Sequence, residues 1–259
     1  MCALSKFTKP KPSLAEPAQA PPLELKGAQL AAAWYGQRTG SDLHDYIRVG
    51  PERVLFALLD VAGSSDQSRA IVSAAQDALR SHGTQLLASE DINEAEAMIE
   101  VCVQMNRAII KAAGRVFACP VFAGCYNESL GTVCYVNAGH TPGLLRDESG
   151  VSELRATGLP LGLFSHSAAD ASIAVLRPNA TLLVVSRGTV DAIAKSKEFG
   201  LETIKDFLLS TTGQNAQEIC AALVGRVKEF MANKPTKNQV TMIVLARSAA
   251  GKSFAASGS

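Results

Sequence analysis

The chain has 259 residues, 47% of them hydrophobic, and its formal net charge is +1 at pH 7. This length and composition suit one large domain with a sizeable core, whereas the near-neutral charge and the lack of a Lys/Arg-rich block argue against a nucleic-acid partner. No apolar run approaches the roughly 18 to 20 residues of a membrane span, so we expect no membrane segment and a soluble, cytoplasmic protein.

The two ends of the chain differ in composition from the rest. Residues 1–22 contain five prolines among Ala, Ser and Lys, with too little apolar periodicity to fold alone. Residues 248–259 are rich in Ala, Gly and Ser. We predict a flexible leader over 1–22, a folded domain over 23–247 and a disordered tail over 248–259.

The domain begins with strand-like sequence. The pattern starts at residue 23 and continues through 28–35, and a polar turn follows at 36–40. Asp42 and Asp45 come next, three residues apart. The residues alone leave open whether these acids form a turn or take part in chemistry.

A buried strand over 53–61 runs into a carboxylate. Its apolar sequence leads directly to Asp60, and Gly63 follows shortly afterwards. A carboxylate in apolar surroundings shifts its pKa, pairs with a cation or binds a metal, because leaving it bare in a low-dielectric site is costly. Asp60 is therefore the first candidate for a functional residue.

Two helices are expected next, over 66–81 with Ser65 as N-cap, and over 91–113. Apolar residues recur at helical spacing in the second helix and should belong to the core: Met98, Cys102, Met105 and Ile109.

Strands over 116–126 and 132–137 should form a hairpin. His140 follows in a turn that contains Gly and Pro, and it could be a ligand or simply a turn residue.

The rest of the chain alternates short strands with two helices. We predict further strands at 151–155, 171–176, 181–185 and 240–246, and helices at 201–209 and 216–232. Because the strands come in hairpins and the helices come in two pairs, the pattern indicates an α+β fold with antiparallel sheets.

The chain has six cysteines but no CxxC pair. Most lie inside apolar stretches, so we expect buried thiols that act as small hydrophobes in a reducing compartment.

Several motifs together resemble one family. Residues 40–45 (GSDLHD) are similar to its G-G-D-x-x-D, 60–63 (DVAG) to D-V-x-G-H-G, and 137–145 (NAGHTPGLL) to N-A-G-H-x-P-x-L-L. Residues 158–163 (GLPLGL) are similar to G-x-P-L-G-L, 186–188 (SRG) to S-D-G, and 238–241 (NQVT) to D-D-x-T. The family is the SpoIIE-like branch of the PPM metal-dependent serine/threonine protein phosphatases. The motifs occur in order over roughly residues 23–247.

This resemblance implies a four-layer αββα sandwich of two antiparallel sheets flanked by helix pairs. It also implies two Mn²⁺ or Mg²⁺ ions that activate a water for phosphoester hydrolysis. By resemblance, Asp60 is the catalytic ligand that bridges both ions and Val61 offers its backbone carbonyl to one. Asp45 corresponds to an acid that reaches the ions through water, and Asp42 to a supporting acid.

The departures from the family pattern concern the second metal. Arg187 stands where S-D-G supplies an acid, and Asn238 stands where D-D-x-T supplies another. A cation at the first position should repel a metal ion, since unit charges about 4 Å apart interact by about 4 kcal/mol even at an effective dielectric of 20. Asp191 lies four residues after Arg187, a spacing that favours a surface ion pair between the two over metal ligation.

The sequence therefore supports two main readings. The first is an impaired phosphatase that acts by binding a phosphoprotein or regulatory partner, with Arg187 pairing with Asp60 or contacting a phosphate. The alternative is an active phosphatase with a reduced Mn²⁺ or Mg²⁺ site. An unrelated α+β binding module is a third. The resemblance implies a phosphoserine- or phosphothreonine-containing regulatory protein as partner.

Overall fold

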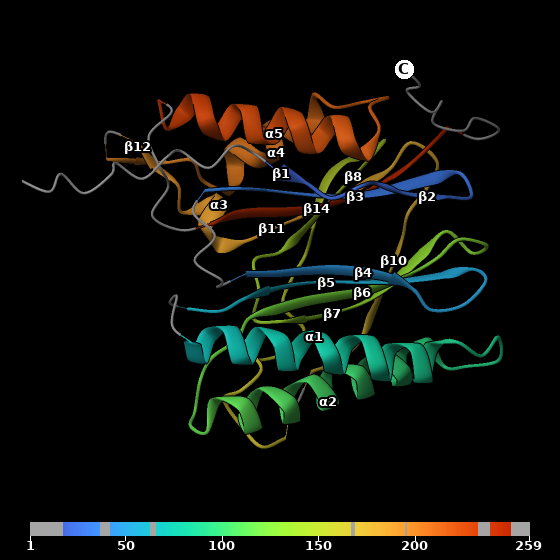
Figure 1. Ribbon diagram of the computed structural model, residues 1–259. Helices are drawn as coiled ribbons and strands as arrows, with labels where there is room; N and C mark the ends of the chain where they lie inside the picture. The colour runs from blue at the N-terminus through green and yellow to red at the C-terminus, as the bar shows by residue number, and fades with distance from the viewer. Residues whose placement is uncertain are drawn as a thin grey trace, which may run out of the picture.

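Two antiparallel β-sheets pack face to face in the computed structural model, and helices cover the outer face of each sheet (Figure 1). The structure describes residues 18–36, 42–62, 66–166, 169–194, 196–232 and 239–249. This arrangement is the four-layer αββα sandwich of the α+β class that the sequence predicted.

One sheet has seven strands. Its order is β1 (Ala18–Gln19), β3 (Ala28–Tyr35), β14 (Val240–Arg247), β11 (Thr181–Val185), β8 (Gly143–Asp147) and β9 (Gly150–Leu154), with β2 (Leu23–Leu25) also paired to β3. Helices α4 (Leu201–Leu209) and α5 (Ala216–Phe230) cover it. Helix α5 starts with a capping box, in which Asn215 and Glu218 each accept a bond from the other's backbone N–H.

The other sheet has five strands. Its order is β10 (Ser172–Val175), β7 (Thr132–Ala138), β6 (Val121–Asn127), β5 (Arg53–Asp60) and β4 (Asp42–Arg48). Helices α1 (Asp66–Leu87) and α2 (Glu94–Ala113) cover its outer face (Figure 1).

Short elements complete the fold: the helix α3 (Arg187–Val190) and the paired strands β12 (Ile193–Ala194) and β13 (Lys197–Glu198). None of the helices in the described part of the chain combines the length and apolarity that a bilayer crossing requires.

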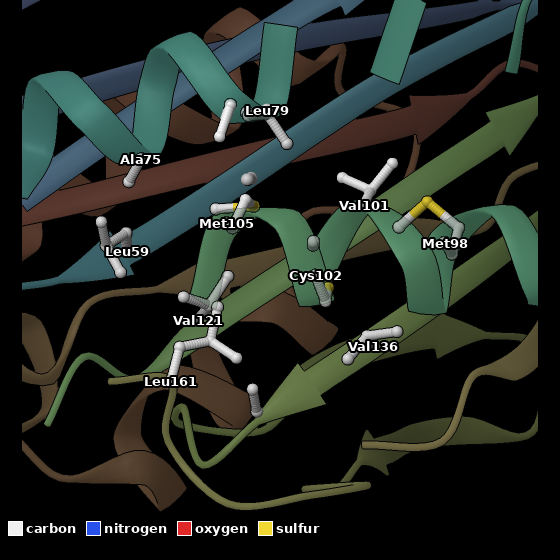
Figure 2. Close-up of a cluster of buried hydrophobic side chains, with 14 of the residues drawn as sticks. Leu59, Ala75, Leu79, Met98, Val101, Cys102, Met105, Val121, Val136 and Leu161 are labelled. Atoms are coloured by element: carbon white, nitrogen blue, oxygen red, sulfur yellow. The ribbon is translucent and has the colours of Figure 1, made fainter. Parts of the chain in front are cut away.

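Strand β5 is buried on both faces, which explains its continuous apolar sequence. Leu55, Ala57 and Leu59 belong to the cluster that α1 and α2 cover, part of which Figure 2 shows. Val54, Phe56 and Leu58 belong to the cluster between the sheets. Because side chains alternate along a strand, Asp60 continues the second row and points between the two sheets.

The structure differs from the predictions most clearly at β4, α1 and β6. Strand β4 was not predicted, because its acids resemble turn formers. Helix α1 continues to Leu87, since Gly83 lets it approach the sheet: a Cβ there would lie 2.2 Å from Cδ2 of Leu55. Strand β6 begins only at Val121, because the preceding segment pairs instead with a loop through a bridge between Cys119 and Leu161.

The ends of the ordered domain also differ from the prediction. Ala18 and Gln19 pair with β3, so these residues of the segment predicted to be a flexible leader belong to the fold. The reason is that β3 has an edge open to pairing. At the other end, Ser248 donates to the carbonyl of Gly27. Residues 1–17 of the leader and 250–259 of the tail lie outside the described residues.

The cysteines follow the prediction. The five in the described residues are free and buried: Cys102, Cys119, Cys125, Cys134 and Cys220. Burial raises the pKa of the Cys102 and Cys119 thiols to about 12, so these thiols stay protonated and unreactive at neutral pH.

Substituting Gly124 tests the packing between the sheets. A Cβ at this position would lie 2.4 Å from Cζ of Phe56, so Gly124→Ala should lower the free energy of unfolding by about 1–3 kcal/mol through overpacking. Urea titration measures this. Gly225→Ala is the control, because nothing lies within 4 Å of its added Cβ and it should stabilise helix α5 by about 0.5–1 kcal/mol.

Candidate functional site

A cleft of about 410 Å³ opens where β5 ends. It lies between the ends of the two sheets, and the backbone N–H of Asp60 holds this end of β5 by donating to the Pro120 carbonyl at 2.9 Å. The residues that line the cleft are Asp42, Asp60, Val61, Ala62, Ala118, Pro120, Arg187, Gly188, Asp191 and Gln239.

Asp42 and Asp60 face each other across β4 and β5. They are direct partners in the antiparallel register, and directly opposed residues point to the same face of a sheet. Each acid accepts a hydrogen bond from the other sheet. Arg187 donates its backbone N–H to Asp60 Oδ2 at 2.9 Å, and Thr241 Oγ1 of β14 donates to Asp42 Oδ2 at 3.0 Å.

The proximity of the two acids affects their protonation. Burial and, to a lesser extent, the nearby Asp60 carboxylate raise the pKa of Asp42 to about 7, although the hydrogen bond from Thr241 opposes the rise. The folded chain therefore holds a proton on Asp42 in a pH range where the unfolded chain has released it.

Asp45, expected to reach metal ions through water, lies on the opposite face of the sheet. Three positions separate it from Asp42, and an odd separation reverses the face of a strand. Its carboxylate accepts two bonds from the Arg80 guanidinium of α1, at 2.6 and 2.7 Å, and one from Gln76 at 3.0 Å. Despite burial, these bonds and the Arg80 charge lower the pKa of Asp45. Asp45 is an anchor for α1 and does not belong to the cleft.

His140, for which the sequence left two roles open, lies next to Asp60. Its Nε2 is 3.5 Å from Asp60 Oδ2, and its side chain is fully buried. The surrounding loop fixes the ring: Asn137 Oδ1 accepts from the His140 backbone N–H at 2.8 Å, and the Thr141 carbonyl lies 3.1 Å from His140 Nδ1. Neither His140 Nε2 nor Asp60 Oδ1 has a hydrogen-bond partner among the described residues.

Arg187 forms the predicted pair with Asp191, with 2.9 Å between Nε and Oδ2. Its side chain is 76% exposed, so the guanidinium is held at the rim and the backbone N–H makes the bond to Asp60. The ion pair between this guanidinium and Asp60, which the sequence suggested, is not found among the described residues. Asn238 lies outside them, and its neighbour Gln239 lines the cleft.

The described residues do not fit the two-metal centre that the resemblance implied. No group of three or more His, Cys, Asp or Glu side chains among them is placed to hold a metal ion. Asp42 and Asp60 are the candidate ligands in the cleft, together with the backbone of Val61, and Asp45 is engaged by Arg80.

The sequence signals identified part of this site. Thr241 was within a quoted motif, but its bond to an acid of the other sheet was not foreseen. Gln239 was also within a quoted motif, whereas the wall residues Ala118 and Pro120 were not predicted. Their sequence carries no signal of chemistry, because they line the cleft only through the pairing of distant segments.

Several solved structures align with this chain over most of its length. The RsbU and RsbW domains of a Mycobacterium tuberculosis protein align with a TM-score of 0.69 and 20% identity over 87% of this chain, which spans 63% of that chain. The PP2C phosphatase domain of SpoIIE from Bacillus subtilis aligns with a TM-score of 0.69 and 15% identity, over 88% of this chain and 64% of that chain. RsbX in complex with magnesium aligns with a TM-score of 0.64 and 13% identity, over 88% of this chain and 99% of that chain. The chain therefore has the PP2C-type phosphatase fold.

The sequence comparison assigns the family. The family described as Stage II sporulation protein E (SpoIIE) matches residues 50–248, and this chain belongs to it. No curated protein matches the chain at a significant level.

Asp42 should make stability depend on pH. Because its folded-state pKa is raised from 3.8 to about 7, stability is fully present below the lower value and is lost as pH rises through the higher one. Asp42→Asn removes this loss. The difference in the free energy of unfolding, variant minus wild type, should therefore be about 1–3 kcal/mol more positive at pH 8 than at pH 5. Urea titrations of both proteins at the two pH values measure it; equal effects at both would contradict the raised pKa.

Asp45 should affect the pH dependence of stability in the opposite direction from Asp42. Asp45→Asn leaves the Arg80 guanidinium without its carboxylate and should cost about 1–3 kcal/mol at pH 7 in the same titration. Because the pKa of Asp45 is lowered, its contribution is present above the ordinary value and disappears as pH falls through the folded value. Glu202→Gln is the control, because its pair with Lys205 is exposed and should contribute less than about 1 kcal/mol.

Proposed function

We propose that this SpoIIE-family domain acts in the cytoplasm by binding a regulatory protein, with hydrolysis of phosphoesters reduced or lost. The observation that supports this most directly is the composition of the cleft. Of the three acids that the resemblance assigned to the metals, two lie in the cleft, and the third is bound to Arg80 on the opposite face.

The charges in the cleft support the same proposal. A pair of divalent ions needs several carboxylates around it, but the backbone of Arg187 already donates to Asp60, and Thr241 donates to Asp42. The guanidinium of Arg187 adds a positive charge at the rim, where the family pattern has an acid.

The nature of the partner rests on the family. The SpoIIE-like branch that this chain resembles acts on small regulatory proteins of partner-switching systems. We therefore propose a protein of this kind as partner. The buried free thiols suit a reducing cytoplasm.

A second candidate is an active phosphatase that uses a reduced Mn²⁺ or Mg²⁺ site. The unpaired atoms Asp60 Oδ1 and His140 Nε2 favour it, because a cation beside them would satisfy both. The two candidates differ in what the purified protein does with a phosphoester.

Hydrolysis of p-nitrophenyl phosphate and of a phosphoserine peptide in the presence of Mn²⁺ separates them. We expect rates no higher than those of Asp60→Ala, because the acids needed to place and activate a water are missing. Mn²⁺-dependent turnover that Asp60→Ala abolishes would show that the second candidate is correct.

Restoring the acids should restore metal affinity. The double variant Arg187→Asp, Asn238→Asp replaces a cation and an amide by two carboxylates, and we expect it to bind Mn²⁺ at least tenfold more tightly than the wild type in calorimetric titration. Asp147→Asn, which removes the carboxylate that pairs with Arg177, is the control and should leave Mn²⁺ affinity unchanged. No gain in the double variant would show that the remaining ligands no longer have the geometry of the family.

A further inference from the structure

Among the described residues, the cleft has more acidic than basic side chains. Among the described residues that line it, three carboxylates stand against one guanidinium: Asp42, Asp60 and Asp191 against Arg187. The guanidinium is already paired with Asp191, so it leaves the two acids at the base of the cleft without a cation. These acids would repel a phosphate, and the phosphate would have to compete with Asp191 for the Arg187 guanidinium.

The buried atoms beneath the cleft also lack hydrogen-bond donors. Both partners of His140 Nδ1 belong to Thr141: the carbonyl, 3.1 Å away, can only accept, and the hydroxyl, 3.0 Å away, donates its own proton to the Val185 carbonyl. His140 Nδ1 therefore carries the proton. In the neutral ring His140 Nε2 is then an acceptor, and it faces a second acceptor, Asp60 Oδ2, at 3.5 Å. The side chain of His140 is fully buried, and within the described part of the chain neither its Nε2 nor Asp60 Oδ1 has a hydrogen-bond partner. Unpaired buried acceptors are costly, and a cationic donor in the cleft would reduce that cost.

One wall of the cleft is apolar. It consists of Val61, Ala62, Ala118 and Pro120, next to the acids at the base. Lysine and arginine have the matching shape, because an apolar stem carries the charged group at its end. A cleft of about 410 Å³ is within the usual range for small ligand groups, roughly 300–1,000 Å³.

We propose that the cleft binds a lysine or arginine side chain of the protein partner, and not a phosphate. The stem lies along the apolar wall and the cationic head donates to Asp60 and Asp42, a geometry for which the planar guanidinium is best suited. This inference rests on the proposed function, because it names the chemical group of the partner that the domain would bind.

The test uses the full chain without metal and N-acetyl-arginine amide as probe, titrated by NMR at pH 8 and low salt. We expect binding with a Kd on the order of 1 mM, at least tenfold weaker binding by Asp60→Asn, and progressive loss with added salt. Asp147→Asn removes one carboxylate that pairs with Arg177 and does not line the cleft; it is the control for charge and should bind like the wild type. Binding that Asp60→Asn leaves unchanged would overturn the proposal.

Arg187→Gln distinguishes a cationic ligand from a phosphate, because it should change the affinities for the two in opposite directions. Removing the guanidinium frees Asp191 and makes the cleft more negative, so the arginine probe should bind at least threefold more tightly. Inorganic phosphate, titrated in parallel, should not bind either protein; phosphate binding by the wild type that Arg187→Gln abolishes would overturn the proposal.

These titrations are independent of the hydrolysis assay. Arg187 is 76% exposed, so its substitution should not prevent folding even if Asp60→Asn does. The proposed function fails if the protein hydrolyses phosphoesters with Mn²⁺. The further inference is tested separately, by the binding titrations without metal. The two failures can therefore be told apart.

Discussion

The cleft depends on hydrogen bonds that join the two sheets at its base. Asp60 and Asp42 belong to the five-stranded sheet, and their donors, the Arg187 backbone and the Thr241 hydroxyl, belong to the seven-stranded sheet or to the short helix that follows it. Two partly buried carboxylates side by side would otherwise repel each other and be poorly solvated. The cross-sheet bonds offset part of this cost, and they also fix the separation of the sheets at the point where the cleft opens.

The structure assigns separate roles to acids that the sequence places together. Asp42 and Asp45 lie three residues apart on β4, yet one points between the sheets and the other toward α1. The first has its pKa raised by burial and by its neighbour Asp60, whereas the second has its pKa lowered by Arg80. One strand thus supplies both a group for the cleft and an anchor for the helix layer, and the cleft is left with fewer acids than its motifs suggest.

Arg187 shows how one substitution alters a site of this fold without disrupting it. Its backbone N–H supports Asp60, a role open to any residue except proline, while its side chain turns outward to Asp191. The fold therefore tolerates the loss of an acid at this position. The consequence is chemical: the cleft retains acidic side chains, but the described residues include no group of three or more ligands placed to hold a metal ion, and on this ground we propose binding as its function.

The sequence by itself determined the layers and most of their elements. Apolar periodicity and turn residues are local properties, so they located the buried strand that ends at Asp60, the helix pairs and the pairing of Arg187 with Asp191 four residues later. Only the tertiary structure decided which of these residues meet. The face on which Asp45 lies, the contact of His140 with Asp60 and the bond from Thr241 to Asp42 depend on strand register and on the packing of segments up to 199 positions apart, and no local pattern in the sequence records such distances.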